Sequence, residues 1–188
     1  MVNKECKGCL QGSQYVQISH MPLRTSSNRL DIVWTDVKGL LLDKAIYGFY
    51  YYITFMDDMT RFSWVFPLMI KNEVFAAFQL FEAMAERETG LKIKVLHMDG
   101  GGEYVSNEMK IYCRNKEYRV HFMQAYRASM NSIPEQLNRM IIEHASAMMW
   151  SVKLPISFWF CAVAVVVYTK NRSPTKALKT TPYEVWYG

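Results

Sequence analysis

Three acidic residues have the types and positions that metal-dependent phosphodiester chemistry requires. Asp36 follows the strand-like run Leu30–Thr35, Asp99 follows the apolar run Ile93–Met98, and Glu135 opens a helical pattern. Mg²⁺ is a hard cation that binds carboxylate oxygens and keeps several water ligands. Two such ions about 3.5–4 Å apart can clamp the attacking and leaving oxygens of an in-line displacement. Crowded carboxylates would stay partly protonated without a cation, so the pattern predicts a site that includes metal.

Glu135 also has an ordinary structural interpretation. Ser132-Ile133-Pro134-Glu135 has the form of a helix capping box, with serine at the N-cap and glutamate three residues later. Pro134 fits there because its missing N–H would have no partner in the first helical turn. Taken alone, the pattern favours capping. Set beside Asp36 and Asp99, it favours a metal ligand.

Asp57 and Asp58 form a second acidic group, between two further strand-like runs. They could bind a metal, but aspartates in a turn more commonly bond to their own backbone and face water. The turn interpretation is the one that the sequence favours. Asp31 is also acidic, but it points to the opposite side of its strand from Asp36, because side chains alternate along a strand.

Strand-like and helical patterns alternate along the chain after a polar N-terminal segment. Runs rich in β-branched and aromatic residues predict an antiparallel meander of three strands at Leu30–Val37, Phe49–Met56 and Phe62–Met69. Apolar residues at three- and four-residue steps predict a helix over Asn72–Glu88, which Gly90 ends. The other predicted elements are a strand at Ile93–Met98, a short helix at Ser106–Cys113, a strand at Arg119–Met123, a helix after Ser132, a helix over Pro155–Lys170 and a last helical turn after Thr181.

The composition indicates one folded, basic domain. The chain has 188 residues, of which 51% are apolar, so it can bury a sizeable core. A net charge of +5 favours a polyanionic partner, although many basic proteins have none. Four cysteines give no disulfide framework, which favours a reducing compartment with Cys113 and Cys161 as buried thiols. No signal peptide is apparent, and the longest apolar run, Ile156–Val167, falls short of the roughly 18 residues that span a bilayer, so we expect a soluble intracellular protein without membrane association.

The acids and the words around them resemble the integrase of Ty1/copia-type LTR retrotransposons. Asp36, Asp99 and Glu135 resemble the Asp-Asp-Glu triad of retroviral-type integrases, and thirty-five residues lie between the last two. The resemblance extends from about Cys6 to Gly188. The words that match in the family's order and spacing are Phe55–Phe62, Asp99–Tyr104, Asn131–Arg139, Tyr168–Pro174 and Thr181–Trp186.

The resemblance implies a ribonuclease H-like α/β fold over residues 30–188, with a mixed five-stranded sheet flanked by helices. Asp36, Asp99 and Glu135 would meet at one sheet edge as catalytic residues and as ligands of Mg²⁺ or Mn²⁺. The implied activity is 3′-end processing and strand transfer of element DNA, in which water or a 3′-hydroxyl attacks a phosphodiester. The implied partners are the element ends and target DNA, bound by a homo-oligomer that is cut from a Gag-Pol polyprotein and acts in the nucleus.

Basic and polar residues around the acids are expected to hold DNA phosphates, in contacts that are sensitive to salt and largely independent of sequence. Asn138 and Arg139 share a helix face with Glu135 at the third and fourth following positions. The expected DNA contacts are Lys38, Arg61, Arg127, Asn138, Arg139, Lys170 and Arg172.

Residues 1–29 are interpreted as the remnant of an N-terminal zinc-binding domain followed by a linker. Cys6 and Cys9 form a CxxC pair, and a structural Zn²⁺ site needs four ligands. The family places two histidines upstream of two such cysteines, so Cys6 and Cys9 would supply half of a zinc site. An ordinary exposed CxxC pair is equally compatible with the sequence.

Several positions near the acids depart from the family pattern. Ser132 stands in place of a glycine, Gln136 in place of an arginine and Gly100 in place of an asparagine, and Pro134 precedes the acid. Gln136 removes a positive charge where DNA is expected. Two alternatives to an active integrase therefore stay open: a catalytically inactive remnant that binds nucleic acid, and a ribonuclease H-like nuclease that cuts without joining.

Overall fold

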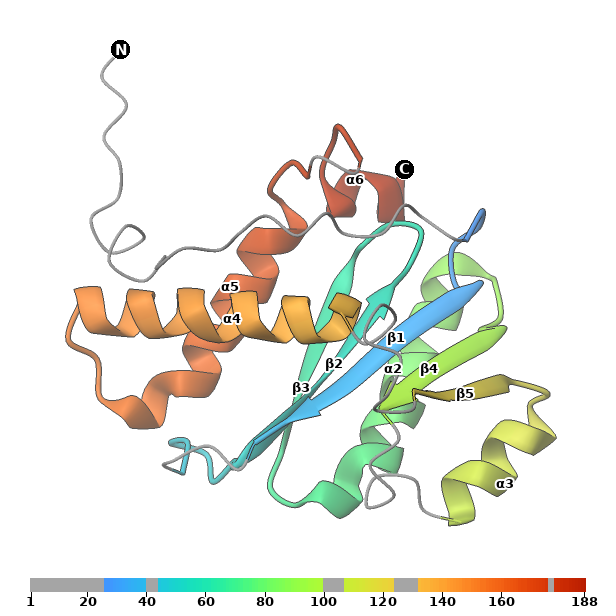
Figure 1. Cartoon of the computed structure of the whole chain (residues 1–188), viewed down its shortest axis with the longest axis horizontal. Coiled ribbons are helices and arrows are strands. Elements are labelled where there is room, and N and C mark those ends of the chain that lie inside the picture. The colour runs from blue at the N-terminus through green and yellow to red at the C-terminus, as the bar shows by residue number, and fades with distance from the viewer. Residues whose placement is uncertain (1–25, 40–43, 100–106, 124–131, 176–177) are drawn as a thin grey trace.

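The computed structural model describes residues 26–39, 44–99, 107–123, 132–175 and 178–188, and shows a central sheet with helices packed against both faces (Figure 1). Short 3₁₀ turns precede two of the helices, at Lys71–Glu73 and Ile156–Phe158. The elements in chain order are β1 (Ile32–Lys38), β2 (Tyr51–Asp57), β3 (Ser63–Leu68), α2 (Val74–Thr89), β4 (Val95–Asp99), α3 (Asn107–Asn115), β5 (Arg119–Met123), α4 (Ser132–Ser151), α5 (Trp159–Asn171) and α6 (Pro182–Tyr187).

The sheet has five strands in the order β3-β2-β1-β4-β5. β1, β2 and β3 form the predicted antiparallel meander, whereas β1 pairs with β4, and β4 with β5, in parallel. β3 is an edge strand, and this position tolerates Pro67 because a proline cannot donate to a second neighbour. The predicted mixed five-stranded sheet is confirmed.

Alternation along the strands gives each face of the sheet its own apolar core. Val33, Phe55 and Leu96 belong to the core shared with α2 and α3. The opposite face carries Trp34 and Tyr52, which pack with α4 and α5. Asp36 has the same parity as Trp34 and therefore faces α4.

α2 forms because its aromatic residues recur on one side. Phe78 and Phe81 are fully buried, and the Phe81 ring stacks on Phe55 with ring centroids 4.3 Å apart and nearly parallel planes. Gly90 ends the helix in the left-handed region at φ 68°, with its N–H donating to the Glu86 carbonyl. The predicted aromatic face and the glycine stop are both confirmed.

Four predicted strand starts, at Leu30, Phe49, Phe62 and Ile93, precede the observed ones by one or two residues. In two of these cases a residue with positive φ lies at or directly before the predicted start. Leu30 and Arg61 have φ values of 61° and 59°, which a strand cannot accommodate. The Leu30 N–H donates to the Asp57 carboxylate instead of joining a ladder. β1 therefore begins at Ile32 and β3 at Ser63.

α4 lies across the α5 side of the sheet and presents an apolar stripe to it (Figure 1). Ile133, Leu137, Ile141 and Ala145 recur at four-residue steps and are each at most 3% exposed. Among the helices of the described ranges, none combines the length and apolarity needed to cross a membrane.

Candidate catalytic site

Asp36 lies on β1 where the strand passes beneath α4. Its side chain is 8% exposed, and its Oδ2 accepts a hydrogen bond of 2.7 Å from the Asn138 amide of α4. Thr54, the register partner of Asp36 on β2, donates through its hydroxyl to the Asp36 backbone carbonyl at 3.3 Å. The carboxylate is thus held at a fixed place between the sheet and the start of α4.

Asp99 is the last residue of β4, and its place follows from the ladder with β1. The parallel register pairs Ile32 with Val95 and Trp34 with His97. The second of these pairs lies two residues before Asp36 and Asp99, so the two acids are expected at the same level of neighbouring strands. The position of the Asp99 side chain lies outside the described structure.

Glu135 occupies the first turn of α4, and its side chain is exposed. Asn138, which binds Asp36, lies one helical turn further along. Residues three apart on a helix have Cβ atoms about 5–6 Å apart, so Glu135 lies on the helix side that approaches Asp36. The hydrogen bonds of the predicted capping box involve Ser132, whose side chain lies outside the described structure, and the capping interpretation stays a prediction.

The surroundings of Asp36 are polar and partly charged. The Lys38 ammonium lies 3.9 Å from Asp36 Oδ2 and is half-exposed. Burial and the negative charge of Asp36 raise the pKa of Tyr52, so this phenol stays protonated at neutral pH. Its hydroxyl is buried without a hydrogen-bond partner in the described part of the chain.

The residues of this site fit a hard divalent cation. Asp36 and Glu135 offer carboxylate oxygens, the ligands that Mg²⁺ takes, and the Asn138 amide orients Asp36 as outer-shell partners orient metal ligands. The described side chains contain no cluster of three or more His, Cys, Asp or Glu that could hold a metal ion. The Asp99 side chain lies outside the described structure, and the three-carboxylate site stays a prediction.

Comparison with known sequences identifies the family. The family profile described as "Integrase core domain" matches residues 28–128, more than half of the chain. The chain belongs to the integrase core domain family. This integrase core is 40% identical over 188 aligned positions to the "Retrovirus-related Pol polyprotein from transposon TNT 1-94" of Nicotiana tabacum, with 97% of the chain covered. It is 28% identical over 185 positions to the corresponding polyprotein from transposon RE2 of Arabidopsis thaliana, again with 97% covered.

These relatives are polyproteins of Ty1/copia-type retrotransposons, so the family predicted from the sequence words is confirmed. The integrase core spans 14% of the length of the TNT 1-94 polyprotein and 12% of the RE2 polyprotein. The chain therefore spans only a small part of the length of the curated relatives that it matches.

Two solved structures share the fold. A chain of the simian T-cell lymphotropic virus intasome in complex with the PP2A regulatory subunit B56 gamma superposes with a TM-score of 0.69 at 16% identity, covering 97% of this chain and 63% of that one. The HTLV-2 integrase catalytic core domain in complex with magnesium, in a trimeric form, gives 0.58 at 16% identity, covering 82% and 94%. The predicted ribonuclease H-like fold is confirmed.

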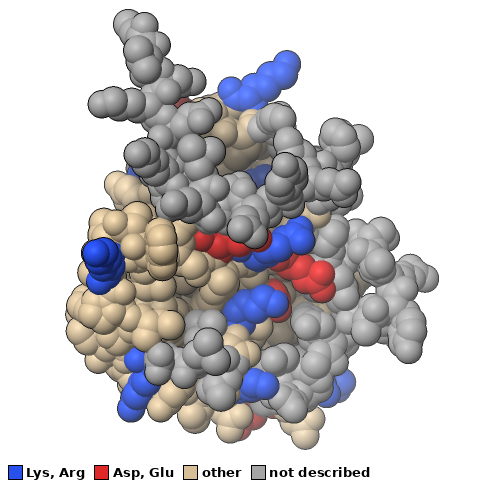
Figure 2. Space-filling view, turned by 60° about the vertical axis from the view of Figure 1, so that its left-hand side comes forward, with Lys and Arg blue, Asp and Glu red and all other residues tan. Residues whose placement is uncertain are grey.

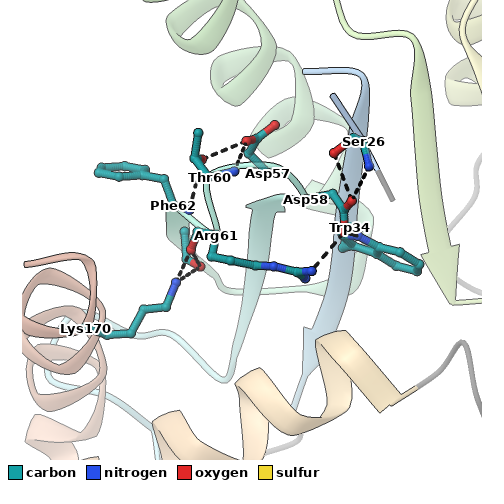
Figure 3. Close-up of polar contacts among 9 residues, drawn as sticks. Ser26, Trp34, Asp57, Asp58, Thr60, Arg61, Phe62 and Lys170 are labelled. Carbon is teal, nitrogen blue, oxygen red and sulfur yellow. Dashed lines mark hydrogen bonds and ion pairs between the residues drawn. The ribbon is translucent and has the colours of Figure 1, made fainter. Parts of the chain in front are cut away.

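Asp57 and Asp58 are turn residues, as predicted, but they do not face water; both are 0% exposed. The Asp57 carboxylate accepts bonds from the backbone of Leu30 and from the backbone and hydroxyl of Thr60. The Asp58 carboxylate accepts from Ser26, whose N–H and hydroxyl bind Oδ2, and from the Trp34 indole (Figure 3). These acids hold the integrase core together, and the expectation that they face solvent is wrong.

Three of the expected DNA contacts have their polar groups engaged within the protein: Arg61 and Asn138 are buried, and Lys170 is half-buried. Arg61 is 3% exposed and its guanidinium lies 3.4 Å from Asp58. Asn138 is 0% exposed and bound to Asp36. Lys170 directs its ammonium to the Arg61 carbonyl and the Ser63 hydroxyl (Figure 3). We withdraw these three residues from the proposed DNA surface.

The remaining basic residues are placed differently. Arg139 and Arg172 are exposed and Lys38 is half-exposed, whereas Arg127, Cys6 and Cys9 lie outside the described residues. On one face of the integrase core, basic and acidic side chains lie next to each other near the middle (Figure 2).

Three further residues bear on the sequence predictions. Cys113 is buried as predicted, and burial raises the pKa of its thiol to about 11, whereas Cys161 is exposed, contrary to prediction, because it lies on the outer side of α5. Sequence reasoning assigned Asn138 to DNA and missed its bond to Asp36. Its spacing of three residues from Glu135 was the available signal, but that spacing does not distinguish a ligand from a support.

Proposed function

We propose that this integrase core carries out metal-dependent 3′-end processing and strand transfer of element DNA. The observation that supports the proposal is the parallel β1–β4 register, whose last pair, Trp34 and His97, lies two residues before Asp36 and Asp99, together with the Asn138 bond that ties Asp36 to the helix of Glu135. From this arrangement we expect the acids of two strands and one helix to meet at one end of the sheet.

Asp36, Asp99 and Glu135 are the residues that would hold Mg²⁺ or Mn²⁺. When bound, a pair of such ions supplies Lewis acidity to the attacking and leaving oxygens of a phosphodiester. Asn138 fixes the rotamer of Asp36, so the carboxylate needs little reorganisation on binding. The half-exposed Lys38 and the exposed Arg139 would hold the phosphates on either side of the acids.

The proposed partners are the two ends of the element and target DNA, bound by more than one copy of the chain. The simian virus relative was solved in an intasome and the HTLV-2 relative in a trimeric form, which supports this assembly. An integrase that joins DNA to a chromosome would act in the nucleus. A Zn²⁺ site at Cys6 and Cys9 belongs to the predicted N-terminal domain and takes no part in this chemistry.

The experiment is a disintegration assay on a branched DNA substrate with Mg²⁺ or Mn²⁺. We expect joined products from the wild-type chain and a loss of about 100-fold or more in Asp99→Asn, because outer-shell changes at metal sites alone cost about 10–100-fold. Asp31→Asn is the matched control, since Asp31 pairs with Lys94 away from the site. Metal-independent turnover, or none, would refute the proposal. Nicks without joining would indicate a nuclease.

A further inference from the structure

The hydroxyl of Tyr52 is a buried polar group that the fold itself does not use. Tyr52 lies on β2 and is 0% exposed. Its ring packs against Trp159 of α5, with ring centroids 6.1 Å apart, and this packing needs no hydroxyl. Among the described residues the hydroxyl has no hydrogen-bond partner. A buried hydroxyl without a partner is destabilising, so its presence points to a use outside the packing of the core.

The register of β1 and β2 places Tyr52 next to Asp36. Asp36 pairs directly with Thr54, and Tyr52 pairs with Lys38. Side chains alternate along a strand, so Tyr52 lies on the same face of the sheet as Asp36 and diagonally across the pair. Diagonal neighbours of this kind are within reach of aromatic side chains. Lys38, directly opposite Tyr52, brings its ammonium to 3.9 Å from the Asp36 carboxylate.

Tyr52 can act as a hydrogen-bond donor towards this acid. Burial and the negative charge of Asp36 hold the pKa of the phenol well above its usual range. The phenol therefore keeps its proton at neutral pH and has one O–H to donate. The packed ring holds this donor in place, since the Tyr52 side chain is fully buried between β2 and the helices of its face.

A divalent cation at Asp36 would bring the acceptors that this donor lacks. Mg²⁺ is bound through carboxylate oxygens and keeps several water ligands. Donors in the outer shell of a metal site orient its ligands, as the Asn138 amide does for Asp36 from the side of α4. We propose that Tyr52 is a second positioning residue of this site, whose hydroxyl donates from β2 to an oxygen ligand of the cation that Asp36 binds. This inference rests on the proposed metal site.

The first test measures Mn²⁺ affinity by electron paramagnetic resonance, without turnover. The wild-type chain should bind Mn²⁺ in a manner that Asp36→Asn abolishes. Tyr52→Phe removes the hydroxyl and keeps the ring, and it should weaken binding by about 10-fold, the lower end of the range for outer-shell changes. Tyr51→Phe is the matched control and should leave the affinity unchanged. It makes the same change at the neighbouring residue, which packs against the core on the opposite face of the sheet.

Urea unfolding without metal distinguishes a positioning role from a structural one. Because the Tyr52 hydroxyl has no partner in the described fold, Tyr52→Phe should unfold at a urea concentration no lower than the wild-type chain. A clearly lower midpoint, or a variant that does not fold, would show that the fold uses the hydroxyl and would overturn the inference.

The outcomes also separate the two proposals. If the wild-type chain shows no Mn²⁺ binding that depends on Asp36, the proposed function and this inference fail together. If it binds Mn²⁺ but Tyr52→Phe has the same affinity, only the role of Tyr52 is refuted. Equal losses of affinity in Tyr52→Phe and Tyr51→Phe would likewise overturn that role and leave the metal site in place.

Discussion

Two acidic groups lie at opposite ends of the β1–β2 pair, and their surroundings differ. Asp57 faces Val33 across the ladder, whereas Asp36 faces Thr54 further along. Asp57 and Asp58 are fully buried, and backbone, hydroxyl and indole groups donate to their carboxylates. Burial raises the pKa of Asp57 even though these hydrogen bonds act to lower it.

Asp36 lies in a different setting. It contacts the Asn138 amide and approaches the half-exposed Lys38, near an exposed Glu135 and the end of β4. The carboxylates of Asp57 and Asp58 are used entirely for internal hydrogen bonds. Asp36 is also held by an internal hydrogen bond, but it lies near side chains that solvent reaches. The comparison teaches that two neighbouring aspartates are poor indicators of chemistry, because a buried turn uses the same residues.

The largest expected effects come from exchanging one carboxylate for an amide in each group. Asp58→Asn should lower the free energy of unfolding by about 3–5 kcal/mol, because it breaks a buried pair with Arg61 and leaves that charge uncompensated. Asp36→Asn should change stability by about 1 kcal/mol or less but abolish metal-dependent joining. Urea unfolding and the joining assay, run on both variants, measure the two effects. If Asp36→Asn unfolds the chain and Asp58→Asn does not, the distinction between a structural Asp58 and a catalytic Asp36 is wrong.

The meander and α2 could be predicted from the sequence because their signals are local. Alternating residues define β1 to β3, and Phe78 and Phe81 define one side of α2. The burial of Asp58 could not be predicted, because its partner Ser26 is thirty-two residues away and follows no spacing rule. The same holds for Arg61, whose burial depends on Asp58.

Glu135 shows where a local signal is ambiguous. Thr181-Pro182-Tyr183-Glu184 has the same form as the Ser132–Glu135 word, and at α6 both bonds of the capping box are present. The same sequence form at two helix starts therefore does not distinguish a glutamate that caps a helix from one that binds a metal. Only the neighbours differ: Asn138 reaches Asp36 one turn beyond Glu135, and no sequence rule anticipates that contact.

A smaller effect should appear in the pH dependence of stability. Lys170 lines a cavity of about 430 Å³ between α4 and α5, together with His144, and burial and the charge of Arg61 lower its pKa to about 7. The unfolded chain holds this proton up to about pH 10.4. Stability should therefore rise with pH between about 7 and 10, by up to about 1.4 kcal/mol per pH unit.

Urea midpoints at pH 7 and pH 9 measure this rise. Lys170→Met should remove it, because the variant has no amine to discharge on folding. Met140→Leu, which lines the same cavity without a titratable group, should keep it. If the free energy of unfolding of Lys170→Met still rises between pH 7 and pH 9, the titrating proton belongs to another residue.

The smallest expected effect distinguishes two exposed arginines that were both assigned to DNA. The Arg172 guanidinium lies 3.7 Å from the Tyr168 ring centroid and 4.3 Å from that of Tyr183, so it joins α5 to α6. Arg172→Gln should cost about 0.5–1 kcal/mol of stability, the usual range for an exposed cation–π contact. Arg139→Gln, on the α4 turn beside Glu135, should leave stability unchanged but reduce the salt dependence of DNA affinity by about one phosphate contact. If Arg172→Gln reduces the salt dependence as Arg139→Gln does, the DNA surface extends from the acids of α4 to α6, because the same guanidinium would then serve both the fold and the phosphate.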